Sequence, residues 1–212
     1  MLIGVVVLLA GCGSSVVPST SPPASVSAAP SLPAATPAPT PSPSTSASTA
    51  PSPSPTPIPS TPPAPFTVST PAFTEGAPIP SRFTCDGPGV SPEVDWSGAP
   101  AASLSLALTV IDPDAGDFVH WLVFDIGATP AGSLKAGLGT SSGTPPQGRN
   151  SRGDPGYTGP CPPAGRHHYV FTLYALDKKL GLSGTPSRAE VDAAIKSHVL
   201  ATAKLAGTYQ RP

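Results

Sequence analysis

The stretch that decides the fold is Leu104–Ile126, which reads LSLALTVIDPDAGDFVHWLVFDI. Its first part, Leu104–Val110, alternates apolar and polar residues, a pattern that predicts a half-buried β-strand. Its last part, His120–Ile126, is rich in aromatic and β-branched residues and predicts a second strand. The segment between them begins Asp112-Pro113-Asp114-Ala115, so the two strands are joined by an acidic turn.

This junction places a carboxylate at the end of one strand and an imidazole at the start of the next. Asp112 and His120 can therefore meet across one rim of the sheet and bind a polar group through charge-assisted hydrogen bonds. The alternative is an ordinary turn, in which the Asp side chains bond their own backbone. The junction alone leaves both interpretations open.

Further strands are predicted on both sides of this pair. His168–Leu176 (HYVFTLYAL) is the clearest, and Phe66–Ser69 and the region around Val94–Trp96 are weaker candidates. The loops between the strands are rich in Gly and Pro, above all Gly137–Gly165.

One helix is signalled, close to the C-terminus. Ser187 followed by Glu190 is a capping-box pattern, and Gly207 is the expected stop. Helical spacing places His198 on the apolar side, packed or partly buried, together with Val191, Ala194, Ile195, Val199 and Leu205. Many strands, long loops and one late helix predict a mainly β domain of the sandwich type with a peripheral C-terminal helix.

The first twelve residues, MLIGVVVLLAGC, are apolar and uncharged. They are fewer than the about 20 residues that a membrane-spanning helix needs, and they match the apolar core of an export signal. The ending Leu9-Ala10-Gly11-Cys12 resembles a bacterial lipobox, in which the cysteine thiol takes a lipid. We therefore expect 1–12 to be a lipoprotein signal sequence with Cys12 lipidated, although the usual basic start is missing. The alternative is a chance apolar N-terminus with a buried cysteine.

Residues 13–65 hold 17 prolines and no charged or aromatic residue. Such a composition cannot bury enough apolar surface to fold, and proline favours extended geometry, so we expect a disordered stalk. Residues 66–212 then form one domain, held at the extracytoplasmic face of a bacterial cell membrane. The net charge of -1 gives no reason to expect nucleic-acid binding.

Two further motifs follow the acidic junction. The first predicts an irregular loop and consists of Gly148-Arg149-Asn150-Ser151 with GYTGPCPP at 156–163. Its backbone N–H groups can face an anion, unless it is an ordinary surface loop. Gly165–Tyr169 (GRHHY) leads into the third strand, where alternation points one histidine inward and the other outward.

Taken in order, DPDA…HW (112–121), GRNS…GYTGPCPP (148–163) and HHYVFTLYALD (167–177) resemble the signatures of the phosphatidylethanolamine-binding protein family, in its bacterial Raf-kinase-inhibitor-like branch. The likeness covers nearly all of residues 66–211. It implies a β-sandwich with a small pocket for an anion such as phosphate or a phospholipid head group. The pocket residues that it implies are Asp112, His120, Gly159, Pro160, Cys161, His167 and Tyr169.

The resemblance also assigns roles within this pocket. Asp112 would orient an imidazole, and a carboxylate beside two imidazoles should favour their charged forms. Three departures from the family pattern lie nearby. Gly116 stands where the family commonly has proline, which predicts a looser rim. His168 replaces the usual arginine between the pocket histidine and tyrosine, which puts the local salt bridge in question. Arg152 stands where bacterial relatives often carry an aromatic residue, which predicts an altered entrance.

The resemblance places Cys85 and Cys161 in loops near the pocket. With Cys12 lipidated, these two remain as a pair in an exported domain, so we expect a disulfide between them. No metal site is expected, because the His and Cys residues lack the close spacing of zinc ligands. No Gly-x-Ser-x-Gly elbow supports serine hydrolase chemistry, and no cofactor is expected.

The expected function is therefore that of a membrane-tethered binding protein, not an enzyme, for a small anion or a phospholipid head group. One alternative is a protein-interaction or inhibitor module with a protein partner, since some family relatives regulate kinases or inhibit proteases. Another is a weak hydrolase that uses Asp112 and His120 as an acid/base pair.

Overall fold

The structure is a computed structural model that describes residues 64–140 and 143–212. The predicted signal sequence with Cys12, and all but the last residues of the predicted stalk, lie outside the described residues. Within the described part, no helix is long and apolar enough to cross a membrane.

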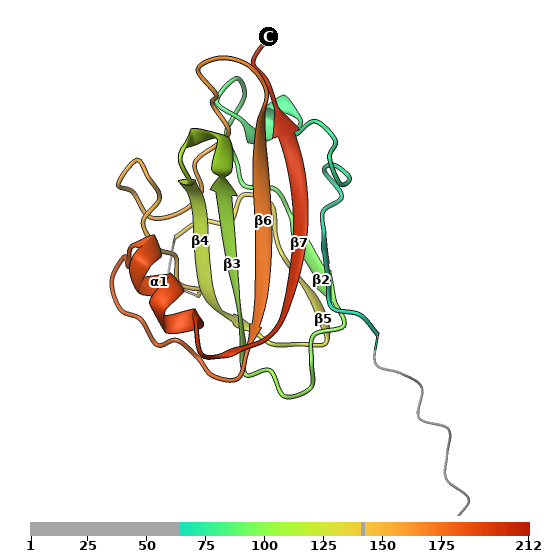
Figure 1. Cartoon of the computed structure of the whole chain (residues 1–212), viewed down its shortest axis with the longest axis vertical. Coiled ribbons are helices and arrows are strands. Elements are labelled where there is room, and N and C mark those ends of the chain that lie inside the picture. Colours follow the sequence, from blue (N-terminus) through green and yellow to red (C-terminus); the bar gives the residue numbers. More distant parts are fainter. Residues whose placement is uncertain (1–63, 141–142) are drawn as a thin grey trace, which may run out of the picture. The chain divides into compact units, whose positions relative to one another are not determined.

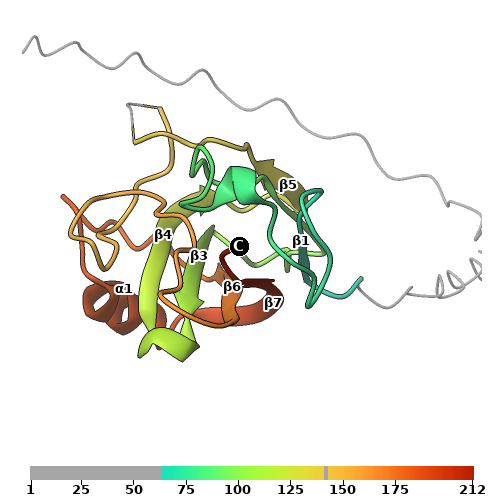
Figure 2. The same cartoon turned by 90° about the horizontal axis from the view of Figure 1, so that it is seen from above.

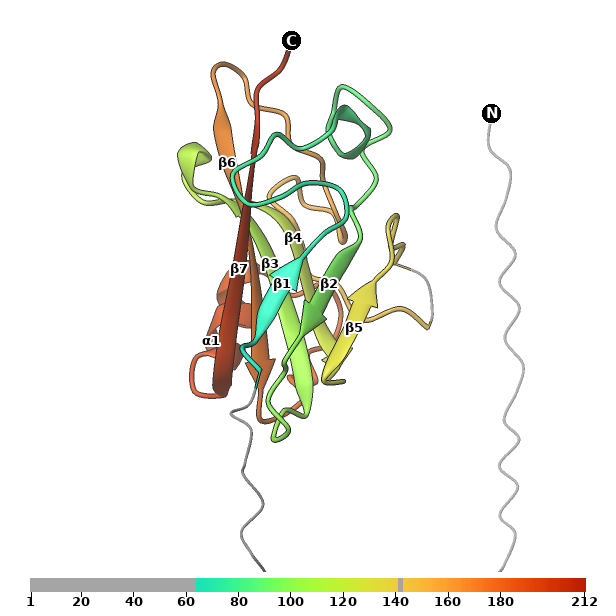
Figure 3. The same ribbon diagram turned by 90° about the vertical axis from the view of Figure 1, so that its right-hand side faces the viewer.

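The described strands form two antiparallel sheets. The smaller sheet has the order β1-β2-β5, with β1 at Thr67–Ser69, β2 at Val94–Ser97 and β5 at Ala131–Leu134. The larger has the order β4-β3-β6-β7, with β3 at Ser105–Asp112, β4 at Phe118–Gly127, β6 at His167–Leu176 and β7 at Val199–Tyr209. Figure 3 shows the smaller sheet in front of the larger one, and Figure 1 looks onto the larger sheet. The predicted mainly β architecture is confirmed, and so are the strands predicted in the regions of β1, β2 and β6.

Strand β3 is buried on both faces, so the prediction of a half-buried strand is wrong. Leu106 and Leu108 belong to the core that both sheets share, whereas Ala107 belongs to a second apolar cluster. Helix α1 (Arg188–Ile195) contributes to that second cluster and lies beside β4 (Figure 1). Because this side of the sheet is covered as well, few positions of β3 are left to face water. Leu104, which lies just before the strand, is 62% exposed.

The predicted helix begins where the sequence indicates. Ser187 and Glu190 form the capping box: the Ser187 N–H donates to the Glu190 carboxylate over 2.7 Å, and the Glu190 N–H donates to the Ser187 hydroxyl over 3.4 Å. The prediction of its length is wrong, because α1 ends at Ile195 and the chain continues as β7. His198 lies between the two elements, partly buried, with its Nδ1 2.8 Å from Asp177.

Strand β7 replaces the predicted second half of the helix because it pairs with β6 along its length. Gly207 is therefore a strand residue opposite Tyr169 and not a helix stop. A Cβ atom on Gly207 would lie 2.7 Å from side-chain atoms of both Phe73 and Ile79. Only glycine lets the segment around these two residues pack this closely on β7.

The loop between β5 and β6 runs along the edge of β4. Three of its contacts are backbone hydrogen bonds of 2.9–3.0 Å: Gly148 N–H to Leu122, Ser151 N–H to Val119 and Thr158 N–H to His120. These bonds satisfy the edge of the sheet and carry the loop to the end where β3 finishes and β4 begins. Figure 2 views the molecule from that end.

Candidate functional site

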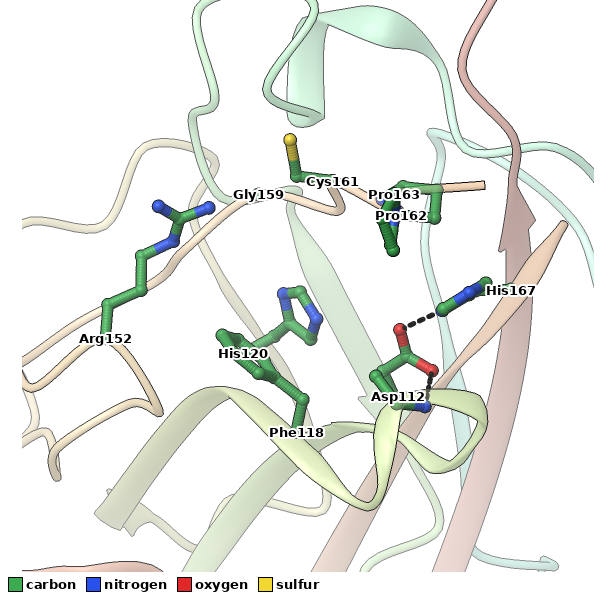
Figure 4. Close-up of a pocket in the computed structure, with 10 residues that line it drawn as sticks. Asp112, Phe118, His120, Arg152, Gly159, Cys161, Pro162, Pro163 and His167 are labelled. Carbon is green, nitrogen blue, oxygen red and sulfur yellow. Dashed lines mark hydrogen bonds and ion pairs between the residues drawn. The ribbon is translucent and has the colours of Figure 1, made fainter. Parts of the chain in front are cut away.

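A cavity of about 170 Å³ lies where β3 ends and where β4 and β6 begin (Figure 4). Its polar lining consists of Asp112, His120, Arg152 and His167. The rest of the wall is formed by Ala115, Phe118, Gly159, Cys161, Pro162 and Pro163. Sites for drug-sized ligands have about 300–1,000 Å³, so this cavity is suited to a small ion or a single head group.

Asp112 uses both of its carboxylate oxygens. It is the N-cap of the 3₁₀ turn η2 (Pro113–Ala115), and Oδ1 accepts the backbone N–H groups of Asp114 and Ala115 at 2.9 and 3.1 Å. Its Oδ2 lies 2.7 Å from His167 Nδ1. The turn interpretation is therefore confirmed through Oδ1, while Oδ2 orients the imidazole of His167 and not that of His120. That this rim binds a polar group stays a prediction.

The hydrogen bonds of the two cavity histidines fix where their protons lie. His120 Nδ1 is 2.7 Å from the carbonyl oxygen of Thr158, which can only accept, so this nitrogen carries a proton. The same holds for His167 Nδ1 against the ionised carboxylate of Asp112. The Nε2 atom of each ring has no hydrogen-bond partner within the described ranges. In a neutral ring this Nε2 is an acceptor, and it becomes a donor when the ring is protonated.

Burial lowers the pKa of His120 below its ordinary value of 6.5. The bond to Thr158 and the charge of Asp112 act in the opposite direction, but they are weaker than the loss of solvation. Asp112 thus favours the charged form of His120, as expected, but burial outweighs it and the net pKa of His120 is lowered. In the unliganded protein at neutral pH, this ring offers a lone pair to the cavity and not a proton.

Two of the implied pocket residues lie behind the cavity and do not line it. The carbonyl of Pro160 accepts the N–H of Cys85 over 3.0 Å. Tyr169 is 1% exposed and meets His120 edge-on, with ring centroids 5.0 Å apart. Its hydroxyl is buried without a hydrogen-bond partner in the described part of the chain. Burial and the nearby charge of Asp112 raise the pKa of Tyr169, so the hydroxyl stays neutral.

The wall opposite the strands is fixed to the 3₁₀ turn η1 (Ser81–Phe83). The expected disulfide between Cys85 and Cys161 is present. Next to it, Gly159 packs against the backbone: a Cβ there would lie 2.9 Å from the Thr84 carbonyl carbon and 3.0 Å from the Phe83 oxygen. The lack of a side chain at Gly159 and the disulfide together set the position of this wall.

His168, which replaces the family arginine, makes two hydrogen bonds to the η2 turn. His168 Nδ1 lies 2.8 Å from Asp114 Oδ2, and the His168 backbone N–H donates to the same oxygen over 2.7 Å. These two bonds lower the pKa of Asp114 below its usual range. His168 thus binds the η2 turn on the side away from the cavity, while His167 lines the cavity. The two neighbouring histidines point in opposite directions, as strand alternation predicts.

The structure adds lining residues that the sequence did not indicate: Ala115, Phe118, Pro162 and Pro163. Phe118 could have been found, because it precedes His120 by two positions in a strand and so shares its face. Their ring centroids are 4.9 Å apart. Arg152, expected to alter the entrance, lines the cavity with an exposed side chain.

Comparison with known proteins agrees with this architecture. The family model described as phosphatidylethanolamine-binding protein matches residues 69–210. A UPF0098 protein of Methanothermobacter thermautotrophicus is 44% identical over 149 residues, which are 68% of this chain and 98% of that protein. LppC of Mycobacterium tuberculosis, named as a candidate lipoprotein, is 44% identical over 154 residues, which are 69% of this chain and 73% of LppC.

Two crystal structures share the fold. CT736 of Chlamydia trachomatis, described as a candidate homologue of the phosphatidylethanolamine-binding proteins, superposes with a TM-score of 0.65 at 34% identity. The match covers 70% of this chain and 99% of CT736. YbcL of Escherichia coli, described as a new member of the mammalian family, gives a TM-score of 0.64 at 33% identity, covering 70% of this chain and 100% of YbcL.

Proposed function

Because the chain belongs to the phosphatidylethanolamine-binding protein family, we propose that its cavity binds a small anion, either inorganic phosphate or the phosphate of a phospholipid head group. One observation carries the proposal. Two imidazoles, His120 and His167, line one small cavity, and each has an Nε2 atom without a partner among the described residues.

An anion would convert these atoms from acceptors to donors. When both rings are protonated, each Nε2–H can donate a charge-assisted hydrogen bond to an oxygen of the anion. Asp112 holds the ring of His167 in place through its 2.7 Å contact. The anion itself would supply the opposite charge that His120 lacks in the unliganded cavity. Anion binding is therefore coupled to proton uptake.

The lining favours binding over turnover. It contains no serine or threonine hydroxyl, and its one cysteine, Cys161, is consumed in the disulfide. Asp112 already accepts three hydrogen bonds, so it is a positioning group and not a free base.

We propose further that the domain is held at the extracytoplasmic face of a membrane by a lipid on Cys12. The lipobox-like ending of residues 1–12 supports this, as does the name of the LppC relative. The disulfide between Cys85 and Cys161 fits an oxidising compartment. Replacing Cys12 by Ser should move the chain from the membrane fraction to the soluble fraction and abolish labelling by fatty acid. Retention of both in the variant would contradict the anchor.

The binding proposal is tested by titrating phosphate into the full chain while the imidazole signals are followed by NMR. We expect shifts at His120 and His167 and none at His198, which lies away from the cavity. The variant His120→Asn can keep the bond to Thr158 through its amide but lacks the Nε2 position. It should therefore bind phosphate at least tenfold more weakly, a loss of about 1.4 kcal/mol in binding free energy. His198→Asn is the matched control. Unchanged binding in His120→Asn would overturn the assignment of the site.

A further inference from the structure

The cavity has unlike charged groups at its two ends. Figure 4 shows the Asp112–His167 pair on one side and the guanidinium of Arg152 on the other, with the ring of His120 between them. The pair comes from the ends of β3 and β6, and Arg152 comes from the loop along β4. A ligand that occupies the middle of the cavity would therefore meet different groups in the two directions.

Arg152 has no partner of its own for its charge. Within residues 64–140 and 143–212 its side chain makes no ion pair and no hydrogen bond. Two other arginines of the domain are held by carboxylates, Arg188 by Asp192 and Arg211 by Asp86. Arg82, Arg149 and Arg166 also make no ion pair within the described residues, but none of them lines the cavity. A guanidinium is always charged, and its planar donors match a carboxylate or a phosphate. At a ligand cavity, an unpaired arginine is therefore open to an anionic group of the ligand.

The backbone at Arg152 is held by hydrogen bonds of neighbouring residues, and its side chain lines the cavity. The preceding residue, Ser151, exchanges two hydrogen bonds with Val119 of β4: its N–H donates over 3.0 Å, and its hydroxyl accepts over 2.8 Å. The Arg152 N–H donates to the Asn150 side chain over 2.9 Å. The field of the guanidinium reaches into the cavity, because it contributes to lowering the pKa of His120.

At the other end of the cavity, the carboxylate of Asp112 already has its hydrogen-bond partners within the protein. Asp112 accepts three hydrogen bonds within the protein and would repel a second anionic group. A ligand with one negative group at the histidines can therefore gain an attractive contact for a second negative group from Arg152. Resting on the proposed function, we propose that Arg152 makes the pocket select phosphate compounds that carry a second anionic group, such as the carboxylate of a phosphoserine head group.

A matched pair of ligands tests this selection. O-phosphoserine and O-phosphoethanolamine share the phosphate and the ammonium and differ only in the carboxylate. The full chain should bind O-phosphoserine about two- to fivefold more tightly at low salt, the range for one partly exposed ion pair. In Arg152→Gln the ratio should fall to about one. Arg149→Gln removes the same charge from an exposed position of the same loop that does not line the cavity, so it should keep the preference.

Inorganic phosphate distinguishes a failure of the proposed anion site from a failure of the role of Arg152. If phosphate fails to bind the unmodified chain, the proposed function falls. If phosphate binds but both amino compounds bind equally, or if Arg152→Gln keeps the preference, only the role of Arg152 is overturned.

Vesicles identify the source of the selected group. The chain carrying Cys12→Ser, which has no site for an anchor, is mixed with phosphatidylcholine vesicles that contain phosphatidylserine or phosphatidylethanolamine. A preference for phosphatidylserine that is lost on adding Arg152→Gln identifies a lipid head group. The same preference seen only with the water-soluble pair identifies a free phosphate compound. Equal binding to both members in both formats contradicts the selection.

Discussion

His167 donates its Nδ1–H to the carboxylate of Asp112 over 2.7 Å, with only 13% and 4% of the two side chains exposed. This bond joins the start of β6 to the end of β3, strands that are neighbours in the larger sheet. The same carboxylate caps the η2 turn. One buried side chain therefore sets both the path of the backbone at the rim and the orientation of a ring in the cavity.

The first prediction concerns this carboxylate. Asp112→Ala removes the cap of η2 and leaves His167 without its acceptor, so we expect the free energy of unfolding to fall by about 1–3 kcal/mol. Asp112→Asn should lose less, because its amide oxygen can still cap the turn. Denaturant unfolding measures both variants. The control is Asp192→Ala, which breaks an exposed pair with Arg188 and should change little. A loss in Asp112→Ala no larger than in the control would contradict the capping role.

The second prediction is that anion affinity rises as pH falls. His120 has a lowered pKa, so it is neutral at neutral pH and gains its Nε2–H only on acidification below the ordinary value of 6.5. Sulfate is the appropriate probe, because it stays a dianion between about pH 8 and about pH 5, the range in which histidine titrates. Its dissociation constant should therefore decrease steadily over this range, and the dependence should be weaker in His120→Asn.

The same shift makes a prediction about stability in the absence of an anion. A lowered pKa means that the unfolded chain binds the proton of His120 first, so the folded state loses stability as pH falls through 6.5. Sulfate should reverse part of this loss, because it binds the protonated folded form. Thermal unfolding with and without sulfate measures both effects. An equal benefit from sulfate at every pH would be evidence against proton-coupled binding.

Local features of the fold could be predicted because they depend on neighbours in the chain. The apolar alternation of Leu104–Val110 predicts β3, the aromatic and β-branched residues of His120–Ile126 predict β4, and the Asp-Pro turn predicts the cap at Asp112. The segment 199–205 could not be predicted in the same way, since its apolar residues fit both helical and strand spacing. The choice is made by hydrogen bonds to β6, which is distant in sequence.

The candidate site could likewise be predicted only in part. The ordered motifs indicated Asp112, His120 and His167, whose positions at strand ends follow from local pattern. The place of Arg152 depends on the bonds between Ser151 and Val119, which join a loop to a strand 32 residues away. No periodicity in the sequence indicates such a contact. The resemblance put Arg152 near the entrance, but its freedom from any carboxylate required the structure.

The fourth prediction concerns the disulfide. Cys85 and Cys161 are 76 residues apart, so opening their bond should lower the free energy of unfolding by about 4 kcal/mol on the chain-entropy estimate. The double variant Cys85→Ser and Cys161→Ser should also bind sulfate more weakly, because the wall that holds Cys161 is released from η1. Peptide mapping without reductant should recover the two cysteines in one linked peptide pair. Cys12→Ser should leave stability and the linked pair unchanged, and finding both thiols free in the native chain would refute the bridge.

The last prediction concerns the close approach at Gly159. A Cβ added there would lie 2.9 Å from the carbonyl carbon of Thr84, which is backbone and cannot move aside like a flexible side chain. Gly159→Ala should therefore displace the wall, lower the free energy of unfolding by about 1–3 kcal/mol and weaken sulfate binding. Gly139→Ala is the matched control, because a Cβ on Gly139 meets nothing within 4 Å. That variant should be neutral or slightly more stable, since alanine restricts the unfolded chain. If Gly159→Ala kept both stability and sulfate affinity, the position of this wall would not depend on its packing against Thr84, and the cavity would have to owe its shape to the disulfide alone.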